Sequence, residues 1–123
     1  MENGIGKLIK SADWKNEKHV PVIAAPAAVK AGEAFEVEVA VGKEIPHPNT
    51  VEHHIAWAAL YFVAEGAPLP VELARATFAA HGGVAVAPAL KATVALPKSG
   101  TLYAVSYCNL HGLWESAKEI AAE

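Results

Sequence analysis

Short apolar segments, each closed by proline or glycine, are the feature that most constrains the fold of this chain. In Phe35–Val41, valine and phenylalanine alternate with glutamate and alanine, which is the pattern of a strand with one buried face. Ile55–Val63 is apolar and aromatic without a polar side, as in a strand buried on both faces. Three further segments between turn signals are predicted to be strands: Val20–Ala24, Leu90–Leu96 and Thr101–Cys108.

Two other stretches carry mixed signals. Val71–His81 joins helix-forming residues to a β-favouring Thr-Phe pair and a His-Gly-Gly turn, and we favour a strand there. Glu115–Glu123 fits either a short helix or an edge strand. Because strands dominate and helical candidates are few, the sequence predicts an all-β fold, an antiparallel sandwich of about seven strands.

Length and charge limit the classes of function. The 123 residues suit one domain, and ten basic against 13 acidic side chains give a formal charge of −3, with no basic cluster to bind nucleic acid. The longest apolar stretches, such as Ile55–Ala64, are far shorter than the ~20 residues of a membrane-spanning helix. Met1–Gly4 lacks the start of a secretory signal. We therefore expect a cytoplasmic protein without nucleic-acid or membrane partners.

Cys108 is the only cysteine of the chain, so it forms no internal disulfide. In a reducing compartment such a thiol is an inert core residue, a nucleophile or a metal ligand. Its surroundings in the sequence help to decide which, because His111 follows it in a Cys-x-x-His pattern that ends in a glycine.

Histidines gather around the predicted turns and strand ends. A lone histidine is most often a surface or hydrogen-bonded imidazole, but only His81 of the six stands apart; the others are His19, His47, His53, His54 and His111. His47 precedes Pro48, which restricts its backbone to extended conformations. Four imidazoles and a thiolate exceed the four ligands of structural zinc. Iron is therefore the metal that we favour.

Three segments together resemble the superoxide reductases, in the one-iron neelaredoxin type of the desulfoferrodoxin family. The resemblance extends from about residue 14 to residue 116. The segments that carry it are Glu17-Lys-His-Val-Pro21, His47-Pro-Asn-Thr-x-Glu-His-His-Ile55 and Tyr107-Cys-Asn-Leu-His-Gly-Leu-Trp-Glu-Ser116.

This resemblance implies an immunoglobulin-like β-sandwich that binds one mononuclear non-haem iron. By motif position, the equatorial ligands would be four histidines and the axial ligand Cys108; the histidines are His19, His47, His53 and His111. It also implies a strand over Val71–Ala80 and a His54 that points away from the metal. Since adjacent residues entering a strand face opposite sides, one of His53 and His54 is indeed expected to miss the site. The chain has no second cysteine, so we expect residues 1–123 to be a single iron-binding domain without an N-terminal desulforedoxin-like module.

The resemblance implies an oxidoreductase that reduces superoxide to hydrogen peroxide. In that family a lysine draws superoxide towards the iron and a glutamate caps the open position of the oxidised centre; the matching residues here are Lys18 and Glu17. The family usually receives its electrons from rubredoxin and assembles as dimers or tetramers.

Two other functions were weighed against this one. A blue-copper-like electron carrier also places cysteine and histidine on a β-sandwich, but it adds an axial methionine, and the only methionine here is Met1. A cysteine hydrolase would use Cys108 with a nearby histidine, but no local signature announces its orienting residue or oxyanion pocket.

Overall fold

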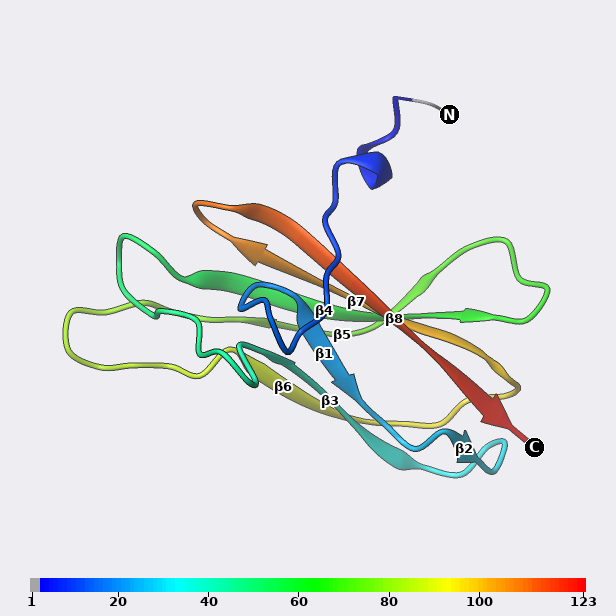
Figure 1. The fold of residues 1–123 in the computed structure, drawn as a ribbon. Coiled ribbons are helices and arrows are strands. Elements are labelled where there is room, and N and C mark those ends of the chain that lie inside the picture. The colour runs from blue at the N-terminus through cyan, green and yellow to red at the C-terminus, as the bar shows by residue number, and fades with distance from the viewer. Residues whose placement is uncertain (1–2) are drawn as a thin grey trace.

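Two sheets lie face to face in the computed structural model, which describes residues 3–123 (Figure 1). The smaller sheet has the strand order β1-β3-β6 and the larger sheet the order β2-β8-β7-β4-β5. The strands are β1 (Pro21–Ala24), β2 (Ala28–Val29), β3 (Phe35–Val41), β4 (Ile55–Ala64), β5 (Val71–Thr77), β6 (Ala89–Val94), β7 (Gly100–Cys108) and β8 (Gly112–Ala122). A short 3-10 helix, η1 (Ile5–Lys7), precedes them.

The predicted fold class is confirmed. Seven of the strands pair antiparallel with their neighbours, and the two-residue β2 adds a parallel pair with the end of β8. The core lies between the sheets, where alternate residues of β3 and β7 are buried. Val37, Val39, Leu60 and Leu102 are fully enclosed there, as expected of the apolar sides of alternating strands.

The ambiguous stretches both form strands. β5 confirms a strand in Val71–His81, but it ends at Thr77, so the expected extension to Ala80 was wrong. The stretch from Glu115 belongs to the eleven-residue β8, which pairs with β7 along the length of that strand. In both stretches, pairing with a neighbouring strand outweighs the helix propensity of the local sequence.

The interpretation of β4 needs a larger correction. Its sequence indicates burial on both faces, but the two faces differ: Leu60 and Phe62 are buried in the core, whereas the large side chains of Trp57, Tyr61 and Val63 are only half-buried on the other side. This outer face of the five-stranded sheet has no third layer over it within residues 3–123.

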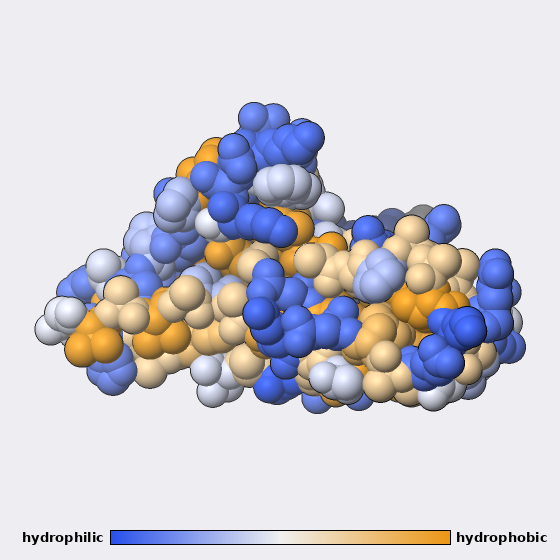
Figure 2. All heavy atoms as spheres, turned by 90° about the horizontal axis from the view of Figure 1, so that it is seen from below, coloured by the Kyte–Doolittle hydropathy of each residue, from blue (hydrophilic) through white to orange (hydrophobic). Residues whose placement is uncertain are grey.

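The three-stranded sheet has a different exterior. Its outward side chains include Glu36, Glu38 and Lys91, and Lys91 lies 3.8 Å from Glu38. Figure 2 views the molecule from this side and shows hydrophilic residues interspersed among hydrophobic ones. Charged outward side chains are typical of a sheet that faces water on one side.

Sheet register brings the predicted site together. In the antiparallel pair of β4 and β7, Ile55 lies opposite Cys108, so the residues just before β4 meet the end of β7. The turn from β7 to β8 carries His111, and His19 comes shortly before β1. No helix within residues 3–123 is long and apolar enough to cross a membrane.

Gly42 lies against the backbone of His47, one of the predicted metal ligands. It has a φ of +76°, and a Cβ there would lie 2.5 Å from the backbone nitrogen of His47. Gly66 offers a matched control, because its φ is +78° and a Cβ there would meet nothing within 4 Å. We expect Gly66→Ala to lower the free energy of unfolding by about 1–2 kcal/mol, the cost of a left-handed alanine.

Gly42→Ala should lose roughly a further 1–3 kcal/mol, because it adds overpacking against His47 to the same backbone cost. Urea unfolding of both variants beside the parent measures the difference. Equal losses at the two positions would show that the close approach at Gly42 is unimportant.

Candidate metal centre

Four of the predicted ligands lie close enough to bind one metal ion together. One side-chain donor atom from each of His19, His47, His53 and Cys108 falls within 4.8 Å of every other. The first two histidines and the cysteine are buried, and His53 is partly buried. A buried group of imidazoles and a thiol is the donor set of a transition-metal site.

His19 is fixed by contacts on several sides. Its Nδ1–H donates to Glu17 Oε1 at 2.5 Å, and its backbone N–H donates to the same oxygen at 2.8 Å. The buried Ser106 hydroxyl donates to the His19 carbonyl at 3.0 Å. Because Glu17 occupies Nδ1, the neutral imidazole presents the lone pair of Nε2 to the group.

His47 is oriented in the same way. Its Nδ1–H donates to the carbonyl of Pro48 at 2.7 Å, an acceptor that again leaves the lone pair on Nε2. Within residues 3–123, the buried Nε2 atoms of His47 and His53 have no hydrogen-bond partner. Buried polar atoms without a partner are costly and need an explanation, and a bound metal ion supplies one.

His111 adjoins this group although it is exposed. Its Nδ1 lies 3.6 Å from Cys108 Sγ and 3.1 Å from His19 Nε2. Two nitrogens that bind one metal at right angles, each about 2.1 Å away, would lie roughly 3.0 Å apart. The observed spacing therefore fits a shared metal as well as an imidazole hydrogen bond.

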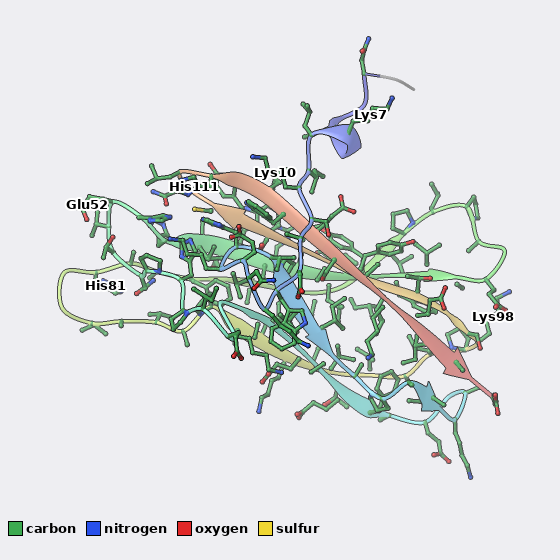
Figure 3. The ribbon with its side chains drawn as sticks, viewed as in Figure 1. Lys7, Lys10, Glu52, His81, Lys98 and His111 are labelled. Carbon is green, nitrogen blue, oxygen red and sulfur yellow. The ribbon has the colours of Figure 1, made fainter. Side chains whose placement is uncertain are left out.

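The remaining histidines lie outside the group. His54 Nδ1–H donates to the Thr50 carbonyl at 3.0 Å, which agrees with the expectation that it misses the site. Both His53 and His54 precede the first residue of β4. His81 lines a separate pocket beside Glu52, and Figure 3 shows these two residues and His111 at one end of the sandwich, with Lys98 at the other.

Burial controls the charge of the histidines. Desolvation lowers the pKa of His47 to about 4, and repulsion from the Lys18 ammonium acts in the same direction. Desolvation also lowers the pKa of His53, with contributions from His111 and Lys18. His47 is therefore neutral near pH 7, the state that metal binding requires.

Glu17 and Lys18 both lie beside this group. Burial acts to raise the pKa of the Glu17 carboxyl, but the hydrogen bonds from His19 outweigh it and leave that pKa below its usual value. Lys18 is half-buried, and its charge reaches His47 and His53 strongly enough to affect their pKa values.

Two supporting residues were missed by the sequence analysis. The Trp114 ring stacks on the His19 ring with a centroid distance of 5.1 Å, and its Nε1–H donates to the His111 carbonyl at 3.3 Å. Asn109 accepts from the His54 N–H at 2.8 Å and donates to the Glu52 carbonyl at 3.0 Å. Asn109 thus ties the end of β7 to the segment that carries His53. The only sequence signal was their position beside Cys108 and His111.

Comparison with known proteins identifies the family of this chain. Residues 11–117 match the model of the desulfoferrodoxin family. The chain belongs to the desulfoferrodoxin family. Among its relatives, the superoxide reductase of Pyrococcus abyssi is 51% identical over 91% of this chain and 95% of its own. The neelaredoxin of Megalodesulfovibrio gigas is 44% identical over 93% and 95%.

Solved structures of the desulfoferrodoxin family share the fold. The superoxide reductase (neelaredoxin) of Ignicoccus hospitalis superposes with a TM-score of 0.85 at 46% identity, covering 98% of this chain and all of that one. The same architecture at this identity confirms the family and fold inferred from the three motifs.

The depressed pKa of His47 makes the stability of the metal-free protein depend on pH. The folded chain holds this imidazole neutral down to about pH 4, whereas in the unfolded chain it takes up a proton near pH 6.5. The unfolded state therefore binds more protons between these values, and the free energy of unfolding should fall as pH drops from about 6.5 to 4. Urea unfolding of the metal-free protein across this range measures the fall.

His47→Gln removes this titration and should show a smaller fall, while His81→Gln, at an exposed position, should behave like the parent. An unchanged pH dependence in His47→Gln would contradict the assignment of the effect to His47.

Proposed function

We propose that this chain is a superoxide reductase that binds one iron ion through five side chains. The side chains that would hold the ion are those of His19, His47, His53, His111 and Cys108. The observation that carries the proposal is the pair of buried Nε2 atoms without partners in His47 and His53, next to a buried thiol. Family membership supplies the activity, because relatives with full-length similarity are superoxide reductases.

The number and type of donors favour iron. Structural zinc takes four ligands, and a blue-copper site uses two histidines, a cysteine and a weak axial group, commonly methionine. Here His111 Nδ1 lies within 3.6 Å of Cys108 Sγ, so a fourth imidazole adjoins the group of four. With five protein donors, a six-coordinate ion would keep one position for a small anion.

Each part of the site has a role in the reaction. When bound, iron supplies the single electron that reduces superoxide. The Cys108 thiolate would donate electron density to the metal, as thiolate ligands do in haem enzymes. Neutral imidazoles leave the thiolate as the only anionic ligand, and Glu17 orients His19 through its Nδ1–H, a contact that also raises ligand basicity.

Lys18 attracts the substrate. The formal charge of the chain is −3, so the overall field opposes an approaching anion and attraction must come from a local cation. Lys18 is adjacent to His19 in the sequence, and its charge affects the pKa values of His47 and His53, whereas charges farther away than the ~8 Å Debye length at physiological salt are largely screened.

The proposal also gives roles to Glu17 and to an electron donor. The family resemblance suggests that the Glu17 carboxylate caps the open position of the oxidised centre, for which it would leave its hydrogen bond to His19 Nδ1. A centre with one iron stores one electron, so a donor protein must resupply it, and the resemblance makes rubredoxin our candidate. Residues 1–123 then act as a single iron-binding domain.

Cys108→Ser distinguishes an iron ligand from a buried structural thiol. Serine has nearly the same volume, so a structural role predicts modest destabilisation and an active site that still works. We expect loss of the thiolate charge-transfer band and at least a hundredfold loss of superoxide reduction. Visible spectra, iron content and consumption of superoxide measure these effects.

Ala104→Ser is the matched control, because Ala104 is a fully buried residue on the same face of β7 and also gains a hydroxyl. It should keep both the spectrum and the activity. A Cys108→Ser variant that also kept them would disprove the ligand role.

Lys18→Met should slow the encounter with superoxide without releasing iron. We expect the second-order rate constant to fall by roughly tenfold and its dependence on ionic strength to flatten, because local steering is lost. Pulse-generated superoxide, followed by the absorbance of the centre, gives the rate. Lys15→Met makes the same change in net charge at an exposed site three residues earlier and should leave the rate near that of the parent.

If Lys18→Met and Lys15→Met react equally fast across a range of salt, Lys18 does not steer the substrate.

A further inference from the structure

Trp114 contacts two of the proposed metal ligands, which come from opposite ends of the chain. Its indole ring stacks on the His19 imidazole, with the ring centroids 5.1 Å apart and the planes inclined by 15°. Its Nε1–H donates to the backbone carbonyl of His111 at 3.3 Å. The two histidines are 92 residues apart in the sequence, so local backbone geometry does not relate their rings. Trp114 joins them through space.

Neither histidine belongs to a strand. His19 comes before β1, and His111 lies in the turn between β7 and β8. His111 is also exposed, so its ring has rotamer freedom that metal binding must remove. Its Nδ1 lies 3.1 Å from His19 Nε2. A hydrogen bond between these nitrogens cannot hold the pair once an ion is bound, because the ion takes the lone pair of each. Another contact must then keep the rings together.

Trp114 is itself held firmly enough to do this. It is 8% exposed and lies opposite Ser106 in the ladder of β7 and β8. The backbone of Lys10 bonds to both neighbours of Trp114 in β8, and the Lys10 ammonium lies 5.8 Å from the centroid of the indole ring. The hydroxyl of Ser106 donates to the His19 carbonyl at 3.0 Å. One cross-strand pair therefore fixes both the ring and the backbone of His19.

A bound metal ion should strengthen the stack. The ion draws electron density from the imidazole and leaves part of its positive charge on the ring. The face of an indole is negative and attracts cations better than the other aromatic side chains do. A metal binds in the plane of the His19 ring, whereas Trp114 lies on its face. The two contacts therefore do not compete.

We propose that Trp114 is a positioning residue of the metal centre, which holds His19 and His111 side by side so that both bind the same ion. The inference rests on the proposed function for the set of ligands, and it adds a residue that touches neither the ion nor superoxide. Preorganised ligands raise affinity because less freedom is lost on binding. Tenfold better retention of the ion corresponds to about 1.4 kcal/mol, which one aromatic stack and one hydrogen bond together can supply.

Two substitutions separate the contacts of Trp114. Trp114→Phe keeps an aromatic face for His19 but lacks the N–H that binds the His111 carbonyl, and Trp114→Leu lacks both. Each variant is loaded with Fe²⁺ in the absence of oxygen and mixed with an excess of a ferrous chelator. We expect Trp114→Leu to lose its iron at least tenfold faster than the parent, and Trp114→Phe to lose it at an intermediate rate.

Ile120→Ala is the matched control for loss of stability. Ile120 is 3% exposed on the same face of β8 as Trp114, but it pairs with Gly100 at the end of the ladder away from Cys108. The cavity that alanine leaves there destabilises the fold, which urea unfolding measures, without removing a contact to either histidine. This variant should keep its iron as long as the parent does.

Co²⁺ gives a second measurement that depends neither on iron nor on the reaction with superoxide. The visible bands of bound Co²⁺ report its ligands and their geometry. At full occupancy the bands of Trp114→Leu should differ from those of the parent, whereas loss of stability alone would lower the occupancy and leave the bands unchanged. A parent that binds Co²⁺ but not iron would contradict the proposed function, and release of Co²⁺ would then decide the role of Trp114.

Three results would overturn the proposal. They are release of the ion from Trp114→Leu at the rate of the parent, release from Ile120→Ala as fast as from Trp114→Leu, and Co²⁺ bands in Trp114→Leu identical to those of the parent. If Trp114→Leu does not fold, Trp114→Phe decides, because it must release the ion faster than Ile120→Ala.

Discussion

The antiparallel pairing of β4 with β7 is the interaction on which the rest of this structure depends. It places Ile55 opposite Cys108, so the loop that carries His53 meets the only thiol of the chain at one end of the sandwich. Asn109 strengthens the junction with hydrogen bonds to His54 and Glu52, and the short turn after Cys108 brings in His111. A shift of this register by one residue would turn Cys108 out of the core, and the site would be lost with it.

Desolvation is the second constraint, and it prepares the site for a metal. Each buried imidazole nitrogen without a partner costs about 1–3 kcal/mol, a penalty that the fold bears at His47 and His53. The same burial lowers the pKa of His47 to about 4 and keeps its ring neutral. A metal ion would bind both nitrogens at once. Removal of this desolvation cost would then add to the free energy of metal binding.

Much of this could be predicted from the sequence, because strand periodicity and turn residues act locally. The alternation of Phe35–Val41 and the other apolar segments between turn residues predicted the β-sandwich, and the resemblance of three motifs to a known family assigned the histidines around Cys108. The extent of β5, the length of β8 and the stacking of Trp114 on His19 could not be predicted, since they follow from pairing between distant segments. The choice of Nε2 in His19 and His47 depends on Glu17 and the Pro48 carbonyl, contacts that only coordinates reveal. The apolar sequence of β4 predicted burial on both faces of the strand, but within residues 3–123 only its inner face is covered by the second sheet.

The most direct test of the central claim is X-ray absorption at the iron edge of the reduced protein, combined with iron content per chain. Five side chains on one ion predict one iron per chain, with one sulfur and four nitrogen neighbours in its shell. In Cys108→Ser the sulfur contribution should disappear. A shell of nitrogen and oxygen alone in the parent, or iron far below one per chain where another metal is bound instead, would contradict the account.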